Sequence, residues 1–350
     1  MIQKENQDKF TTWTVSPQLK SYGKPVEFVG GKIIFDLMEE VKLVGPTDAR
    51  VLVTGETGTG KSLIARAMHY VHPERGPNIF RPVNVGALVP DLASSQLFGH
   101  VKGAFTGADH ENHGIALEAN KGTMYVDEID SCTRAVQTLL LTIIETSVIR
   151  PVGGGSRDYH DVDIRFITSS IKDSHALSKI IRTDLYHRIA EYHIALPPLR
   201  ERGDDISQLA FYFLQKASAQ FRKKMTALTK IDQDAIQRMN QHPWYGNVRE
   251  LNHAINAAVI RSRVDRSTNE LKNKWIILIE TASNECIEAD EHIGVLFNAN
   301  RKLNEAALEF KKNWVDRVVK ISNNRTEASE TLGIDPKTLK NILNSDLGDR

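Results

Sequence analysis

The octapeptide GETGTGKS, residues 55–62, constrains the fold of this chain more than any other segment. A β-branched run, RVLVT, precedes it and an amphipathic stretch, SLIARAMHYV, follows it, which is the strand-to-helix setting of a phosphate-binding loop. Its glycines let backbone N–H groups and a helix N-terminus face a polyphosphate. The alternative is a plain glycine turn between a strand and a helix. We predict that Lys61 contacts the outer phosphates and that Ser62 binds magnesium. The predicted nucleotide-binding residues are Gly55, Glu56, Thr57, Gly58, Thr59, Gly60, Lys61 and Ser62.

Short β-branched runs alternate with amphipathic stretches through the first half of the chain. This alternation predicts a parallel sheet with helices on both faces, an α/β domain over 26–198. The residues before this domain, 1–25, show no periodicity and are predicted to form a tail. The predicted strands of the sheet are 49–54, 78–85, 123–126, 163–169 and 192–196.

After residue 198 the strand pattern stops, and apolar residues recur at helical spacing. This predicts a small all-α domain over 199–262, with Asp204 or Asp205 capping its first helix. Asn247, with Glu250 three residues later, resembles a capping box that opens another helix. A linker is predicted over 263–302, in which WIILIE is compatible with either a strand or a buried helix turn, and a separate helical domain over 303–350.

Composition excludes several classes of protein. The 45 Lys and Arg residues against 44 Asp and Glu give a net charge of +1, so no overall field attracts nucleic acid or a membrane surface. Cys132 and Cys286 are the two cysteines, too few for a disulfide scaffold or a zinc ribbon. The polar start has no signal peptide, and no apolar run approaches the roughly 18 residues of a membrane span. We therefore expect a cytoplasmic protein with no membrane partner.

Two further groups of side chains carry candidate chemistry. Asp127 and Glu128 follow the predicted strand TMYV, at the sheet edge where ligands bind in open α/β folds. We predict that Asp127 holds magnesium and that Glu128 polarises the attacking water; the alternative is a strand that ends at the surface. Arg182 and Arg188 could neutralise charge on a transferring phosphoryl group from a neighbouring subunit, or could be solvated helix residues.

A family resemblance rests on these motifs and on the hexapeptide GAFTGA, residues 103–108, preceded by QLFGHVK. Together with GTMYVDEID, RTDLYHRIAEYHIALPPLRERGDDI and HPWYGNVREL, they resemble, in order, the motifs of bacterial enhancer-binding proteins. These are the AAA+ ATPases that activate sigma-54 RNA polymerase. The resemblance covers residues 28–261 and implies a P-loop AAA+ domain, with a five-stranded parallel sheet and a helical lid.

The resemblance implies a role for each matching residue. Asp127 and Glu128 correspond to the Walker B pair, and Asn84 to the asparagine that holds the catalytic glutamate inactive until the nucleotide state changes. Val29 and Gly30 would border the adenine of ATP. The other implied roles are Arg182 and Arg188 as fingers acting across a subunit interface, Arg249 as sensor II, Ser170 in sensor I, and Gly103, Ala104, Phe105, Thr106, Gly107 and Ala108 as the contact with the sigma factor.

Several positions depart from the family pattern. Ile171 stands where the family commonly has asparagine or histidine, and its side chain cannot hydrogen-bond a phosphate or water. Gln96 and Val101 replace two carboxylates beside the hexapeptide, and Tyr245 replaces a proline. Fewer than 30 residues precede the ATPase domain, too few for a regulatory domain of about 100 residues. We therefore expect control by a regulatory protein, by a paralogous subunit or by expression level.

The C-terminal segment NNRTEASETLGIDPKTLKNIL resembles a Fis-type helix-turn-helix. A helix, a turn at Gly333 and a second helix capped by Asp335 predict a major-groove reader of enhancer DNA, whereas a helical hairpin that closes the fold is the alternative. The apolar stripe of helix 303–321 is a candidate dimer seam. The predicted DNA-binding residues are Lys337, Thr338, Lys340, Asn341 and Asn344.

These inferences together predict a sigma-54-dependent activator. The resemblance implies a hexameric ring, with a dimer at rest, that binds ATP and Mg²⁺ and remodels the closed promoter complex into the open one. Two alternatives remain: another AAA+ remodelling ATPase, such as a protease-associated unfoldase, and a DNA-binding regulator of conventional promoters on an AAA+ scaffold.

Overall fold

The computed structural model describes residues 2–7, 9–18, 23–155, 157–221, 228–262, 270–276 and 278. The predicted helix-turn-helix over 303–350, with its five predicted DNA-binding residues and its dimer seam, lies outside the described residues, as does most of the predicted linker. Within the described residues, no helix is both long and apolar enough to cross a bilayer.

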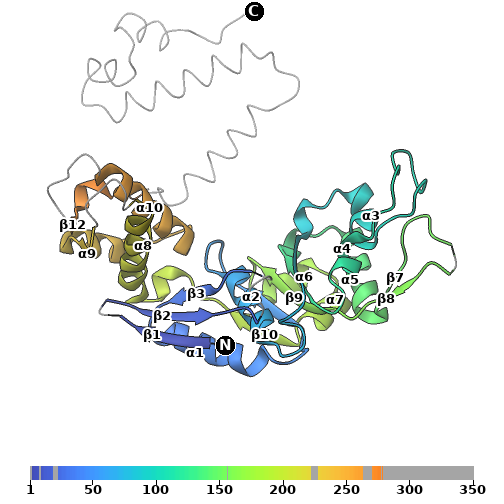
Figure 1. Cartoon of the computed structure of the whole chain (residues 1–350), viewed down its shortest axis with the longest axis horizontal. Helices are drawn as coiled ribbons and strands as arrows, with labels where there is room; N and C mark the ends of the chain where they lie inside the picture. The colour runs from blue at the N-terminus through green and yellow to red at the C-terminus, as the bar shows by residue number, and fades with distance from the viewer. Residues whose placement is uncertain are drawn as a thin grey trace, which may run out of the picture. The chain divides into compact units, whose positions relative to one another are not determined.

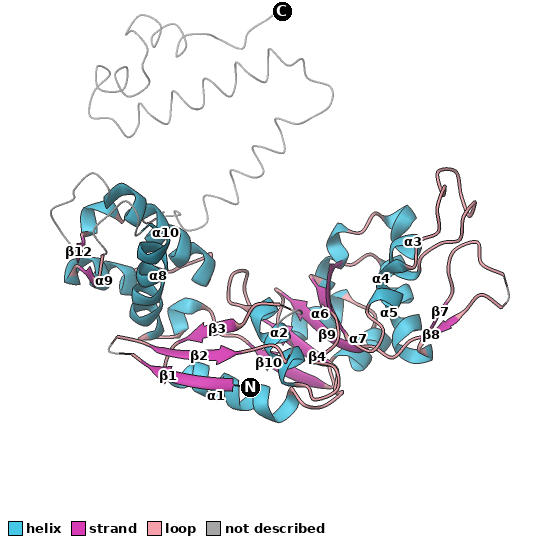
Figure 2. Ribbon diagram, in the orientation of Figure 1, coloured by secondary structure: helices cyan, strands magenta, loops and turns pink. Residues whose placement is uncertain are grey.

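A five-stranded parallel sheet in the order β10-β4-β9-β6-β5 is the centre of the α/β domain. Every predicted strand is present, and β4, β9 and β10 are labelled in Figure 2. In this order β4, the strand that leads into the phosphate-binding loop, lies between β10 and β9. The strands are β4 (Val51–Thr54), β5 (Phe80–Asn84), β6 (Thr123–Asp127), β9 (Arg165–Ser170) and β10 (Tyr192–Ala195).

Helices cover both faces of this sheet because neighbouring strand residues point to opposite sides. Tyr125 and Ile167 face α1 (Lys32–Val44) and α2 (Lys61–Val71), whereas Met124 and Phe166 face the other helices. Those on the second face are α3 (Ala93–Phe98), α4 (Gly114–Glu118), α5 (Arg134–Thr146), α6 (Ser174–Ile180) and α7 (Thr183–Ile189). A small hairpin pairs β7 (Val148–Ile149) with β8 (His160–Asp161).

The prediction that residues 1–25 form a tail is wrong. β1 (Ile2–Asn6), β2 (Thr11–Val15) and β3 (Val26–Val29) form an antiparallel sheet beside α1, as Figure 1 shows. Alternation is weak in this polar segment, and the strands form because Trp13, Val15 and Phe28 pack into the core around α1 and α2. The segment also contacts the lid, since Phe10 is buried against Tyr212.

The helical lid contains α8 (Asp205–Phe221), α9 (Gln233–Gln241) and α10 (Asn247–Arg261). It extends beyond the predicted boundary at residue 262: β11 (Lys230–Ile231) pairs with β12 (Glu270–Leu271), and Trp275 and Ile276 are buried in its core. In the WIILIE segment, Trp275 ends a 3₁₀ turn, Asn273–Trp275, rather than a strand. The capping role predicted for Asn247 is also wrong, because Gly246 precedes the helix and its N–H donates to Glu250 at 2.8 Å.

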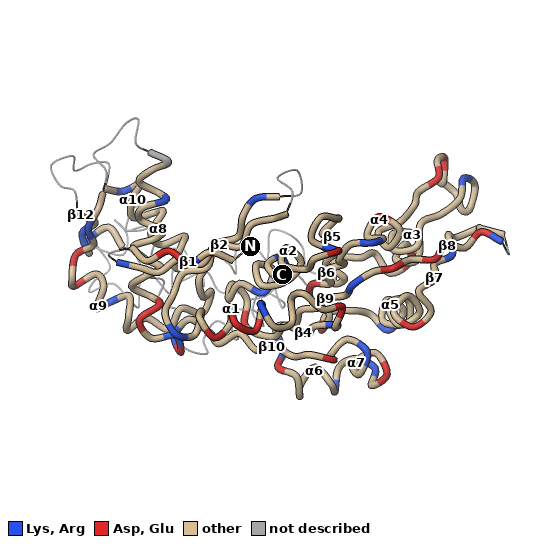
Figure 3. Tube along the Cα trace, turned by 60° about the horizontal axis from the view of Figure 1, so that its bottom comes forward, with Lys and Arg blue, Asp and Glu red and all other residues tan. Residues whose placement is uncertain are grey.

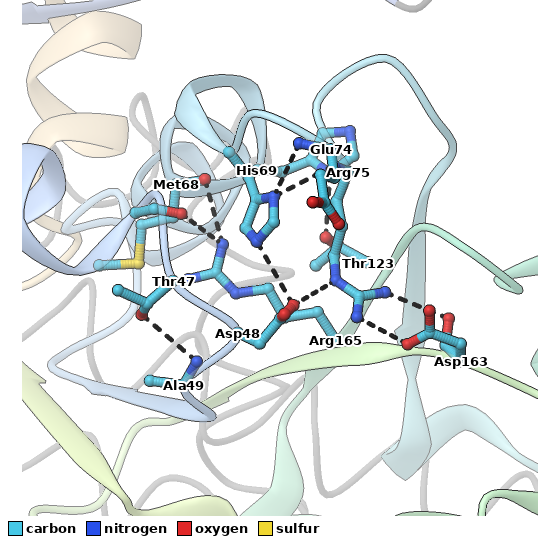
Figure 4. A network of polar contacts seen from close by, with 12 residues as sticks. Thr47, Asp48, Ala49, Met68, His69, Glu74, Arg75, Thr123, Asp163 and Arg165 are labelled. Atoms are coloured by element: carbon cyan, nitrogen blue, oxygen red, sulfur yellow. Dashed lines mark hydrogen bonds and ion pairs between the residues drawn. The ribbon is translucent and has the colours of Figure 1, made fainter.

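A buried polar network holds the strand ends opposite the phosphate-binding loop (Figure 4). The Arg165 guanidinium, 1% exposed, donates to the Gly45 and Val44 carbonyls at the end of α1 and to the Met68 carbonyl in α2. Next to it, Arg75 bridges Asp48 and Asp163 at 2.5 and 2.7 Å. The Arg165 guanidinium thereby satisfies carbonyls that a helix C-terminus leaves without partners.

Charges of both signs alternate along the described part of the chain rather than gathering by sign (Figure 3). This agrees with the balanced composition, and it leaves local geometry rather than net charge to define the binding sites.

Candidate active site

A cavity of about 410 Å³ lies at the carboxyl end of the parallel strands, between the α/β domain and the lid. The phosphate-binding loop lines it through Thr57, Gly58, Thr59, Gly60, Lys61 and Ser62, whereas Gly55 and Glu56 do not. On its other sides the cavity meets Phe28 and Val29 from β3, and Leu209 and Phe213 from α8. One end is thus formed by backbone N–H groups and the other by apolar side chains, which suits a phosphorylated, ring-bearing ligand.

Lys61 begins α2, directly after Gly60 in a left-handed conformation. Its ammonium group donates to the carbonyls of Gly55 and Glu56, at 2.6 and 3.1 Å, and thereby spans the loop. Burial lowers the pKa of Lys61, and the nearby Asp127 carboxylate opposes this shift. The ammonium group is therefore positioned where a polyphosphate would replace the two carbonyls as its partner.

Asp127 and Glu128 reach the cavity at the end of β6. Glu128 has a left-handed backbone, φ 58°, which an L-residue adopts only at some cost and which turns its side chain out of the strand. The Asn84 amide donates to Glu128 Oε2 at 2.9 Å, from the end of the adjacent strand β5. The contact predicted between this asparagine and the glutamate is therefore present.

Asp127 and Ser62 supply the oxygen ligands that magnesium prefers. Both line the cavity beside Lys61. Among the described residues, no three His, Cys, Asp or Glu side chains gather into a metal-binding cluster. Mg²⁺ keeps several waters and uses one or two carboxylates together with substrate phosphates, and Asp127 lies beside the phosphate-binding loop in this way. The donor set therefore fits Mg²⁺ bound with a nucleotide.

The structure brings together most of the other predicted site residues. Val29, Ser170 and Arg249 line the cavity, and Arg249 projects into it from the lid helix α10. Gly30 does not line the cavity, and a Cβ there would approach the Asp205 carboxylate to 2.6 Å. Ile171 also lines the cavity and is 44% exposed, so an apolar side chain faces the site at that position.

Arg182 and Arg188 do not line the cavity of their own chain. Arg182 donates to both oxygens of Asp184, at 3.0 and 2.7 Å, and Arg188 lies 3.4 Å from Glu145. Both pairs are solvent-accessible, so they contribute little to stability. Within one subunit the two guanidinium groups therefore have no access to the cavity.

The GAFTGA loop lies away from the cavity, beyond α3. Its backbone closes on itself, because Gly103 N–H donates to the Ala108 carbonyl at 2.9 Å and Ala108 N–H to the Phe105 carbonyl at 3.0 Å. Phe105 is 38% exposed at the tip, and His100 contacts one edge of its ring. Thr106 and Gly107 are also exposed, whereas Ala108 is buried.

Sequence patterns do not single out the residues that join the lid to the phosphate-binding loop. Asn247, fully buried, donates to Glu56 Oε2 and to the Thr57 carbonyl, both at 3.0 Å, and accepts from Leu199 N–H. Arg200 binds both carboxylate oxygens of Glu56, at 2.9 and 2.5 Å, and this contact lowers the pKa of Glu56. Glu56, which is predicted to bind nucleotide, thus also ties the loop to the lid.

Comparison with known proteins places these features in a family. Residues 30–195 match the Sigma-54 interaction domain, and residues 200–274 match the AAA+ ATPase lid domain. The anaerobic nitric oxide reductase transcription regulator NorR of Escherichia coli O1:K1 is 40% identical over 237 residues, which cover 67% of this chain and 46% of NorR. NorR of strain SMS-3-5 is 39% identical over the same length. The chain thus spans about half the length of the curated relatives it matches.

Solved structures agree with this assignment. NtrX from Brucella abortus in complex with ADP has a TM-score of 0.66 and 26% identity, covering 91% of this chain and 68% of that one. NtrX from the same organism in complex with ATP has a TM-score of 0.64 and 25% identity, covering 90% of this chain and 68% of that one. The matched domains, the parallel sheet with its lid and the site at their junction establish that this chain carries the AAA+ ATPase domain of the sigma-54-dependent transcription activators.

Proposed function

We propose that this protein binds and hydrolyses ATP in an oligomeric ring and uses the cycle to press its GAFTGA loop against sigma-54 RNA polymerase, which opens the promoter complex. One observation carries the proposal. Lys61, Asp127 and Glu128 converge on one cavity, while Phe105 remains exposed on a separate loop. Hydrolysis and partner contact are thus assigned to different parts of one domain.

In the hydrolytic site, each side chain has a distinct task. Lys61 binds the outer phosphates, Ser62 and Asp127 hold Mg²⁺, and Glu128 orients the attacking water. The metal neutralises charge on the phosphate oxygens when it is bound. Asn84 holds Glu128 in a fixed orientation, and a change in this 2.9 Å contact is how we expect the nucleotide state to be signalled. Val29 and Gly30 border the adenine, while Ser170 and Arg249 contact the phosphate side.

The ring is proposed because the two predicted finger arginines do not line the cavity of their own subunit. Arg182 and Arg188 lie outside their own cavity, and each is oriented by an acidic neighbour. A neighbouring subunit in a hexamer would bring them to the phosphates, where a guanidinium stabilises developing charge. The same assembly could include a paralogous subunit or a regulatory protein.

Mixing two inactive variants tests this arrangement. Arg182→Ala subunits retain an intact phosphate-binding loop, and Lys61→Ala subunits retain an intact finger. Their mixed interfaces should recover part of the ATPase activity, whereas neither variant alone should hydrolyse ATP. Co-assembly is verified by crosslinking. If co-assembled subunits never recover activity, Arg182 does not act across the interface.

The central experiment separates hydrolysis from promoter opening. Phe105→Ala should retain near-normal ATPase activity and lose open-complex formation on a sigma-54 promoter, because an exposed aromatic side chain is a typical interface anchor. Phe35→Ala removes an aromatic ring of similar exposure, 43%, from α1 and is the matched control. Normal open-complex formation by folded Phe105→Ala protein would refute the proposed function.

Enhancer binding is proposed for residues 303–350 on the sequence pattern. Lys337, Thr338, Lys340, Asn341 and Asn344 are the proposed contacts with DNA, from a dimer that docks two recognition helices. Lys340→Ala should weaken DNA binding. If this lysine contacts a phosphate, the slope of log affinity against log salt concentration should also become shallower by about one. An unchanged salt slope in an electrophoretic mobility assay would argue for the helical hairpin instead.

A further inference from the structure

We infer that Tyr125 and Ser169 are positioning residues that fix the Asp127 carboxylate for its metal. This inference rests on the proposed Mg²⁺-dependent ATPase and adds two residues to it. The Tyr125 hydroxyl lies 3.0 Å from Asp127 Oδ1, and the Ser169 hydroxyl donates to the same oxygen.

Strand geometry explains why these residues meet. Tyr125 and Asp127 are two positions apart on β6, so their side chains lie on the same face of the sheet. β9 pairs in parallel with β6, with Val126 opposite Thr168, which places Ser169 beside Asp127. The Tyr125 ring packs against Phe80, with 5.9 Å between the ring centroids, so the hydroxyl extends along the strand toward the cavity.

Burial makes this arrangement rigid. Tyr125 is 2% exposed and Ser169 is fully buried, and the two hydroxyl groups are 3.0 Å apart. A buried hydroxyl without a partner would be costly. The Ser169 hydroxyl donates to Asp127 Oδ1, and the single proton of the Tyr125 hydroxyl has Asp127 Oδ1 and Ser169 Oγ, each at 3.0 Å, as its acceptors.

The three donors all reach one oxygen of the carboxylate. Glu128 N–H donates to Asp127 Oδ1 as well, at 3.2 Å. Among the described residues, none donates to Oδ2. Oδ1 is therefore saturated, and Oδ2 is left as the oxygen that faces Mg²⁺ or its water. Mg²⁺ demands near-ideal octahedral geometry, so a carboxylate that cannot rotate favours its binding.

The test measures metal binding directly, apart from turnover. Free Mn²⁺ is followed by electron paramagnetic resonance in the presence of ADP and the full chain. Tyr125→Phe and Ser169→Ala should each weaken Mn²⁺ binding roughly tenfold, as expected when a group that orients a metal ligand is removed. Affinity for a fluorescent ADP analogue in EDTA should not change, because the phosphate-binding loop is intact.

Tyr70→Phe is the matched control, since it removes a buried tyrosine hydroxyl that binds the Lys24 carbonyl at 3.2 Å, outside the cavity. It should leave Mn²⁺ affinity unchanged. Wild-type Mn²⁺ affinity in both test variants would overturn this inference and leave the proposed function standing. The same holds if metal-free ADP binding weakens as much as Mn²⁺ binding does. A wild-type protein that binds no Mn²⁺ with ADP would overturn the proposed magnesium site, and this inference with it.

Discussion

Two glycine-containing loops of this domain use the same residue for different reasons. In the phosphate-binding loop, Gly58 has φ 80°, and a Cβ there would lie 2.3 Å from the Gly246 carbonyl oxygen of the lid. In the GAFTGA loop, Gly103 and Gly107 have φ 81° and 97°, but an added Cβ would meet no atom within 4 Å. At Gly58 the first loop packs against the lid, whereas the second has open space at both glycines and is in contact with Gly153 and His100 through Ala104 and Phe105.

This contrast separates two kinds of function. Close packing of lid against loop is what a lid that responds to the nucleotide would require, because a ligand can shift an equilibrium only through contacts that differ between states. The GAFTGA loop lacks such packing at its glycines, which leaves Phe105 accessible to a partner. Loops of this second kind commonly carry binding function on a rigid scaffold.

The largest expected effect lies in the packed site. Glu128→Gln should lower ATP turnover a hundredfold or more, because the amide cannot take a proton from the attacking water. Binding of a fluorescent ATP analogue should persist, since Lys61 and Ser62 are intact. Turnover is measured by phosphate release, with Glu39→Gln, an exposed carboxylate paired with Lys42 on α1, as a stability control. Ordinary turnover in Glu128→Gln would remove this residue from the mechanism.

Gly58→Ala tests the close approach itself. The substitution combines a left-handed backbone with a contact against the lid, and each such strain costs about 1–3 kcal/mol. We expect nucleotide affinity to fall roughly thirtyfold, an effect of about 2 kcal/mol, in a calorimetric titration with ADP. Wild-type affinity would mean that the lid does not pack on the loop as described.

Acidification should weaken the helix that begins at the phosphate-binding loop. Burial lowers the pKa of His69 on α2 from 6.5 to about 4. Below pH 6.5, His69 binds a proton in the unfolded chain but not in the folded chain. The folded state therefore loses stability relative to the unfolded state as the pH falls toward 4. Between pH 7.5 and 5 the free energy of unfolding should decrease by about 2 kcal/mol through this residue.

Urea unfolding of the wild type and His69→Gln at the two pH values isolates that contribution. Glutamine does not titrate, and it can still hydrogen-bond Thr123, the partner of His69 at 2.9 Å. On acidification the free energy of unfolding of the variant should therefore decrease by about 2 kcal/mol less than that of the wild type. Identical pH dependence in both proteins would show that His69 titrates normally in the folded state.

The smallest effect is expected in the open loop. Gly107→Ala meets no neighbouring atom, so its cost is the left-handed backbone alone, about 1 kcal/mol. ATPase activity and nucleotide affinity should stay within twofold of the wild type, and thermal unfolding should shift by a few degrees at most. A collapse of ATPase activity would erase the distinction between the two loops.

Several features of the site could be predicted because local patterns specify them. The phosphate-binding loop, the five strands and the carboxylates after β6 depend on residues close in the chain, where periodicity and turn chemistry act. Asn84 and Glu128 lie far apart in the chain, and the family resemblance rather than spacing predicted their contact. By contrast, Trp13 and Val15 form β2 in a segment with little alternation, because tertiary packing supplies what local propensity does not.

By itself, then, the sequence determined an α/β nucleotide-binding domain with a helical lid, and where its charged groups would emerge. Tertiary structure decided which groups they meet. Asn247 reaches Glu56 rather than capping its own helix, and Tyr125 and Ser169 converge on one oxygen of Asp127. The physical reason is that a buried polar group must find a partner, and in a packed core that partner is set by which elements lie side by side, not by spacing along the chain.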